Sequence, residues 1–173
     1  MARMHGHSKE IVEQLTGEHK VGDVGQIIFI FIFLGVWIAD SFVLKYTTFL
    51  NHSIPVVVRI VLAVVLFILS GYMAGKGLTI VFGRVREKPD VIRESVFSWV
   101  RHPIYLSEIL LYLALICLSI SLAAATVWVV TIVFLHFISR YEERLLLGRF
   151  GEAYEQYMRE VPMWIPRLGK KGD

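Results

Sequence analysis

Two short polar segments hold the side chains of this sequence that are best suited to chemistry. The first is Arg-His-Pro-Ile-Tyr at 101–105, directly before a long apolar stretch, and the second is the pair Glu142 and Glu143, about 37 residues after Tyr105. Arginine and histidine are costly in hydrocarbon, so their place at the edge of an apolar stretch needs an explanation. With the carboxylates they offer charge-assisted hydrogen bonds of both signs, which suit a ligand that is itself charged.

The apolar stretches predict the helices that must position these two segments. Hydrophobic residues make up 55% of the 173 residues and the mean hydropathy is +0.60, both unusual for a soluble domain. A membrane-spanning helix needs about 20 mostly apolar residues. Four stretches meet this requirement, at roughly 24–46, 55–80, 103–121 and 123–146. We therefore predict an all-α, polytopic membrane protein with about four transmembrane helices.

The last two helices are expected to form a tight hairpin, with its turn between Ser119 and Ala125. Such a hairpin returns both polar segments to one face of the membrane. There they would form a single cluster of cations, carboxylates and aromatic rings beside lipid. This cluster could hold a charged, water-soluble cosubstrate and admit a lipophilic partner from the side.

The chain divides into three parts under this interpretation. Residues 1–23 form an amphipathic segment along the interface, 24–88 the first two spans, and 89–173 the last two spans with their loop and tail. Within the tail, the spacing of Tyr154 and Tyr157 predicts a short amphipathic helix that Pro162 ends.

Lysine and arginine predict the orientation. With four spans, the amino terminus, the second loop and the tail share one side, which then holds 15 of the 18 lysines and arginines. The positive-inside rule places this side, and both termini, in the cytoplasm. The net charge of +3 therefore needs no nucleic-acid partner, and membrane lipids are the expected surroundings. His5 and His7 lack further ligands nearby in sequence, so no metal site is expected.

Each chemical candidate also has a purely structural interpretation. Arg101 could reach lipid headgroups, and His102-Pro103 could simply start a helix. Glu143 could pair with Arg140 at i,i+3 on a solvated helix face. Their combination at one membrane face fits these separate interpretations less well. Asp40, near the outer end of the first span, is expected to pair with Lys45.

The two motifs together resemble a known family. "RHPIY" and the later "EERLLLGRFGEAYEQYMREVPMWIP" look like the isoprenylcysteine carboxyl methyltransferase and phospholipid methyltransferase group of integral membrane enzymes. The resemblance covers residues 89–167. It implies methyl transfer from S-adenosyl-L-methionine, with S-adenosyl-L-homocysteine as product, to a lipophilic amine or carboxylate that enters from the bilayer.

The resemblance also implies a donor pocket at the cytoplasmic ends of the last two helices. Glu142 would hold the ammonium group of the donor. The residues that would line this pocket are Pro89, Asp90, Val91, Ile92, Phe97, Arg101, His102, Pro103, Ile104, Tyr105, Glu142 and Glu143. The chain departs from the family at Phe97, where a tyrosine is common, and at Ile138, where the prenylcysteine enzymes carry a substrate-binding arginine.

Two residues are candidates for a role in the reaction. Arg140 could position a carboxylate acceptor, and Glu108, one turn into the third span, could take a proton from an amine if burial favours its neutral form. Glu108 could instead pair with Arg101. An acidic residue after the first motif is also frequent in the related sterol reductases. The alternatives are therefore an NADPH-dependent reductase or a non-catalytic membrane protein of the same fold.

Overall fold

The computed structural model describes residues 22, 24–82 and 90–166, and within them the secondary structure is entirely helical. Three helices are long and apolar enough to cross a membrane: Val24–Leu44, α2 (Val56–Phe82) and α4 (Leu122–Phe150). The shorter apolar helix α3 (Pro103–Ser119) and the tail helix α5 (Glu152–Glu160) complete the chain. The expected helical membrane architecture is confirmed, while most of the predicted interfacial segment 1–23 lies outside the described residues.

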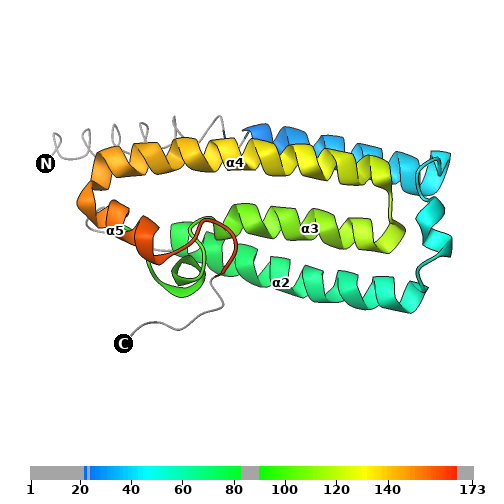
Figure 1. Ribbon diagram of the computed structural model, residues 1–173, viewed down its shortest axis with the longest axis horizontal. Coiled ribbons are helices and arrows are strands. Elements are labelled where there is room, and N and C mark those ends of the chain that lie inside the picture. Colours follow the sequence, from blue (N-terminus) through cyan, green and yellow to red (C-terminus); the bar gives the residue numbers. More distant parts are fainter. Residues whose placement is uncertain (1–21, 23, 83–89, 167–173) are drawn as a thin grey trace, which may run out of the picture.

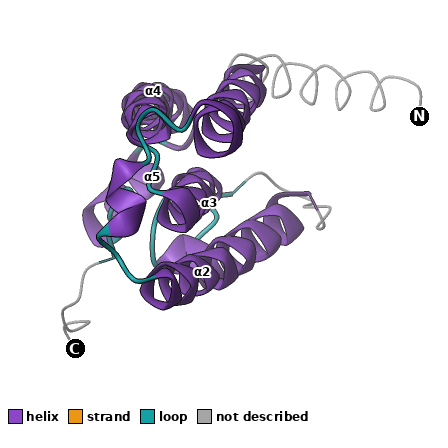
Figure 2. Cartoon of the chain, turned by 90° about the vertical axis from the view of Figure 1, so that its right-hand side faces the viewer, coloured by secondary structure: helices purple, strands orange, loops and turns teal. Residues whose placement is uncertain are grey.

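The apolar helices, including the shorter α3, alternate in direction along the chain (Figure 1). As a result, α5 and the start of α3 lie at the same end of the bundle, which we call the polar end and which contains residues 90–102 and 151–166. Seen along the bundle, α3 lies between α2 and α4, and the helix Val24–Leu44 lies beside α4 (Figure 2). The short helix α3 therefore occupies the centre of the packing.

Local sequence explains where the helices of the hairpin begin and end. Pro103 is the first residue of α3, where a missing N–H costs nothing. The turn to α4 falls at Ile120, which has a left-handed φ of 40°, and at Ser121, whose hydroxyl accepts from the N–H of Ala124 at 3.1 Å. This turn lies within the predicted range. At its other end α4 continues to Phe150, four residues past the predicted end of the transmembrane span at 146. Gly151, with a φ of 54°, ends the helix.

Aromatic rings and polar side chains join the helices to α3. The ring of Phe33 stacks on Tyr112 with centroids 4.0 Å apart. From α2, the hydroxyl of Ser70 donates to the backbone oxygen of Ser107 at 2.7 Å. From α4, the indole N–H of Trp128 donates to the oxygen of α3 Ile109 at 2.9 Å.

At the end opposite the polar end, the buried carboxylate of Asp40 organises the loops. Its oxygens accept from the hydroxyl of Ser121 at 2.5 Å, from the N–H of Thr47 at 3.1 Å and from the Thr47 hydroxyl. The expected ion pair with Lys45 is wrong, because the side chain of Lys45 is exposed and two hydroxyls take its place. A satisfied buried carboxylate of this kind fixes the loop after Val24–Leu44 to the α3–α4 turn.

The outward faces of the long helices are apolar. Val57 and Ile68 of α2 and Phe137 of α4 are each about two-thirds exposed. Exposed apolar faces on helices of this length are those that contact lipid. The protein is an integral membrane protein.

Candidate functional site

The two polar motifs meet at the polar end. The loop before α3 supplies Arg101 and His102, the first turn of α3 supplies Tyr105, and the last third of α4 supplies Glu142 and Glu143. The hairpin therefore brings together the core of the predicted site from segments about 40 residues apart.

The imidazole of His102 lies between the two carboxylates. Its Nε2 is 3.3 Å from Oε1 of Glu143, and its Nδ1 is 3.6 Å from Oε2 of Glu142. The hydroxyl of Tyr105 donates to Oε1 of Glu142 at 2.5 Å. The rings of His102 and Tyr105 are parallel, with centroids 5.5 Å apart. Both glutamates are thus oriented by side chains of the first motif.

Arg101 connects this cluster to the tail. Its Nε donates to Oε1 of Glu143 at 2.7 Å, and its Nη1 donates to the backbone oxygens of Met158 at 2.9 Å and Val161 at 2.5 Å. The backbone N–H of Arg101 donates to the backbone oxygen of Pro162 at 2.9 Å. Arg101 therefore binds the end of α5 instead of reaching out to headgroups, and it acts on the site through Glu143.

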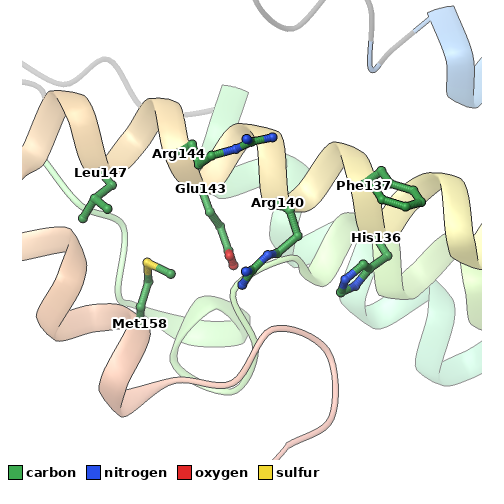
Figure 3. A pocket seen from close by; sticks show the side chains of 7 residues that line it. All are labelled: His136, Phe137, Arg140, Glu143, Arg144, Leu147 and Met158. Carbon is green, nitrogen blue, oxygen red and sulfur yellow. The ribbon is translucent and has the colours of Figure 1, made fainter.

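Glu143 lines a cavity, and its second carboxylate oxygen is buried. Glu143 is 2% exposed, and its Oε2 has no hydrogen-bond partner among the described residues. The cavity has a volume of about 450 Å³, within the usual range for small-molecule sites (Figure 3). It is lined by His136, Phe137, Arg140, Glu143, Arg144, Leu147 and Met158. Arg140 thus reaches the site as a lining residue, and its expected pairing with Glu143 is wrong because Arg101 occupies that carboxylate.

The tail helix α5 is anchored under the cluster by two tyrosines. The hydroxyl of Tyr157 donates to the backbone oxygen of Phe97 at 2.7 Å, and Val91 packs against Tyr154 and Tyr157. Burial raises the pKa of both tyrosine hydroxyls, so they stay neutral donors. Among the predicted donor contacts, Val91 and Phe97 therefore serve the docking of α5.

The other predicted lining residues lie elsewhere around the polar end. Pro103 and Ile104 face α2, where a Cβ on Gly77 would be 2.9 Å from Cγ1 of Ile104. Asp90 is exposed and accepts from the N–H of Val91, while Ile92 is half-buried and Pro89 lies outside the described residues.

Glu108 is separate from the cavity. It is buried on α3, where its Oε1 accepts from the hydroxyl of Tyr112 at 2.7 Å. The alternative in which Glu108 pairs with Arg101 is therefore wrong, since Arg101 is engaged with Glu143 and the tail. Glu108 is not among the residues that line the cavity.

Sequence reasoning missed Gly22 and five residues that line the cavity, which are His136, Phe137, Arg144, Leu147 and Met158. Gly22 is buried, and a Cβ there would lie 3.5 Å from the hydroxyl oxygen of Tyr105 and 3.7 Å from Oε1 of Glu142. No sequence pattern points to Gly22, whereas the spacing of Arg140, Arg144 and Leu147 places all three on one face of a helix.

Comparison with known proteins identifies the family of the chain. A family model described as protein of unknown function (DUF1295) matches residues 11–161. The chain belongs to this family. The methanethiol S-methyltransferase of Crocosphaera subtropica is 32% identical over 150 residues, which cover 86% of this chain and 50% of that protein. The chain thus spans about half the length of this relative, and no solved structure matches it.

These findings bear on the relationship inferred from the two motifs. The DUF1295 match includes the first motif, the second motif as far as Val161 and the helices between them, and the relative is a methyltransferase by name. The relationship to a membrane methyltransferase family is therefore confirmed.

Proposed function

We propose that the protein is an S-adenosylmethionine-dependent methyltransferase whose site lies at the polar end, facing the cytoplasm. The observation that carries the proposal is the arrangement of Glu142 and Glu143 around the imidazole of His102, where Glu143 also lines a cavity and its Oε2 is buried without a hydrogen-bond partner among the described residues. A buried carboxylate oxygen without a partner is costly unless a ligand donates to it.

The chemistry of the residues present fits this donor. Its ammonium group suits Glu143 of the cavity lining together with Glu142, which lies outside the lining on the other side of His102, and its carboxylate suits Arg140 or Arg144. Its apolar parts suit Leu147 and Met158. When bound, the donor supplies an electrophilic methyl group on a sulfonium ion.

The residues around the site then contribute by holding the two glutamates in fixed positions. Arg101 holds Glu143 through one oxygen and leaves the other for the ligand, and the Tyr105 hydroxyl orients Glu142. Docking of α5 by Tyr157 covers the cluster and keeps water out. Methyl transfer is an in-line displacement, so fixed geometry and a dry site are the main contributions that an enzyme makes.

We further propose that the acceptor is an anion, a thiolate or a carboxylate. Arg140 and Arg144 give the cavity a positive potential, which stabilises a thiolate relative to its thiol. An amine would need a base, and Glu108 is outside the cavity lining. The name of the relative favours sulfur. The acceptor enters from the bilayer past Phe137, whose exposed ring lines the cavity.

The test is calorimetric titration of the protein in lipid nanodiscs with S-adenosylhomocysteine and, separately, with NADPH. We expect micromolar binding of S-adenosylhomocysteine that weakens at least tenfold in Glu142→Gln, as loss of a charged partner predicts. Glu152→Gln, on the exposed face of α5, is the matched control and should bind as wild type does. Binding of NADPH alone would overturn the proposal in favour of a reductase.

The acceptor class is tested by methyl transfer from isotopically labelled donor. Small alkyl thiols, a long-chain carboxylate and phosphatidylethanolamine are offered in parallel, and we expect product from the thiols first. Labelling of phosphatidylethanolamine alone would contradict an anionic acceptor.

A further inference from the structure

The ring of Phe134 on α4 packs directly over Gly25 of the helix Val24–Leu44. A Cβ on Gly25 would lie 2.3 Å from Cζ of Phe134, a distance that real side chains do not reach. One turn further along, the ring of Phe29 meets the same Phe134 ring at 4.8 Å between centroids. Glycine at 25 therefore leaves the room that the Phe134 ring occupies between the two helices.

The packing of these two helices places Gly22 directly on the site. The Cβ it lacks would be 3.3 Å from Cγ2 of Ile138, 3.5 Å from the Tyr105 hydroxyl and 3.7 Å from Oε1 of Glu142. The backbone at Gly22 thus lies beside the hydrogen bond between Tyr105 and Glu142. An alanine Cβ there would contact Tyr105 and Glu142 at ordinary van der Waals distances and press slightly on Ile138, whereas a larger side chain would have to displace one of these three groups.

The two faces of α4 consequently have different surroundings. The face with Ile138 and Glu142 is closed by the start of the first helix, whereas the face with Arg140 and Arg144 borders the cavity and α5. The start of the first helix thus lies within contact range of Glu142, and a side chain longer than that of alanine at position 22 would press on the carboxylate that faces His102.

We propose that Gly22 is a specificity-determining position of the donor site. At this position the start of the first helix packs against Tyr105 and Glu142 and limits the space available to the Glu142 carboxylate. The ligand class is the amino-acid end of the methyl donor, an ammonium bound by a carboxylate. This inference rests on the proposed function, because it takes Glu142 as the group that binds the donor.

The experiment is titration of S-adenosylhomocysteine into Gly22→Ala and Gly22→Leu in nanodiscs. Gly35→Leu is the matched control, since it lies on the same helix and a Cβ there meets nothing within 4 Å. We expect a loss of about threefold in affinity for alanine and about tenfold or more for leucine, the effect of overpacking a tight site. Gly35→Leu should bind as wild type does. Equal affinities of Gly22→Leu and wild type would overturn the inference.

A double-mutant cycle separates this role from a general loss of structure. If a side chain at 22 acts by displacing Glu142, Gly22→Leu combined with Glu142→Gln should bind no more weakly than Glu142→Gln alone. Additive losses would show that Gly22 acts independently of Glu142 and would overturn the inference. Should the leucine variant not fold, Gly22→Ala is carried through the same cycle.

The two proposals fail in different ways. If wild-type protein does not bind S-adenosylhomocysteine, the proposed function fails, and the role of Gly22 in donor binding fails with it. If wild type binds and Glu142→Gln is impaired but the Gly22 variants are not, only the inference about Gly22 fails.

Discussion

The guanidinium of Arg101 and the carboxylate of Glu143 lie 2.7 Å apart, with side chains only 8% and 3% exposed. The same guanidinium donates to the backbone oxygens of Met158 in α5 and of Val161 directly after it, so one arginine joins α4, the start of α3 and the tail. A buried ion pair of this kind matters most when one partner is removed, because the other charge is left without compensation.

Arg101→Ala should therefore destabilise the protein strongly. We expect a loss of about 3–5 kcal/mol in the free energy of unfolding, measured by denaturation in detergent, because Glu143 is left buried without its permanently charged partner and with only His102 beside it. Arg159→Ala is the control, since its pair with Glu155 is exposed and is worth less than about 1 kcal/mol. Similar losses in both variants would show that burial of the Arg101 pair is unimportant.

Arg140→Ala and Arg144→Ala should impair the use of the acceptor. For an anionic acceptor we expect its KM to rise about tenfold, the cost of one charge-assisted hydrogen bond, while a neutral acceptor is unaffected. Arg149→Ala, on the same helix but outside the cavity lining, should leave KM unchanged. If KM did not change in either cavity variant, the acceptor would not be held by these cations.

Asp40→Ala should lower stability without affecting the site. The variant leaves the hydroxyls of Thr47 and Ser121 without their acceptor, which costs about 1–3 kcal/mol. Affinity for S-adenosylhomocysteine should stay within about twofold of wild type, because Asp40 lies at the opposite end of the bundle. A large loss of affinity in a variant that remains folded would show that the two ends are coupled.

Tyr157→Phe should change how stability depends on pH. Burial holds the folded-state pKa of this hydroxyl above its ordinary value near 10, so its contribution is complete below pH 10 and is lost as the pH rises further. We expect the wild-type melting temperature to fall more steeply above pH 10 than that of the variant. Below pH 10 the variant should lose about 1 kcal/mol, the value of the hydrogen bond to Phe97. Tyr141→Phe, at an exposed position, is the control, and identical pH slopes for wild type and Tyr157→Phe would contradict the expectation.

The helices and the hairpin could be predicted because local sequence determines them. Long apolar stretches specify the spans, Pro103 specifies the start of α3, and the turn at Ile120 and Ser121 falls in the predicted range. The hairpin in turn brings Tyr105 to Glu142. Each of these steps needs only the period of a helix and the thickness of a bilayer.

The partners of the charged groups could not be predicted in the same way. Sequence spacing suggested Arg140 for Glu143 and Lys45 for Asp40, because it shows only which residues are neighbours on one element. The observed partners, Arg101 and the hydroxyls of Thr47 and Ser121, arrive from other elements. Their positions depend on the path of the tail and on how closely the helices pack, and the sequence of a single segment determines neither.

The length of α3 has a consequence for the position of the site in the bilayer. Its 17 residues span about 25 Å, whereas the hydrocarbon core is about 30 Å thick. The neighbouring helices α2 and α4, with 27 and 29 residues, reach across fully. Because α3 lies between α2 and α4, its start falls short of the level that the end of α4 reaches (Figure 1). A ligand bound beside Arg101 and His102 would therefore lie below the outermost turns of α4, close to the acyl chains of the surrounding lipid.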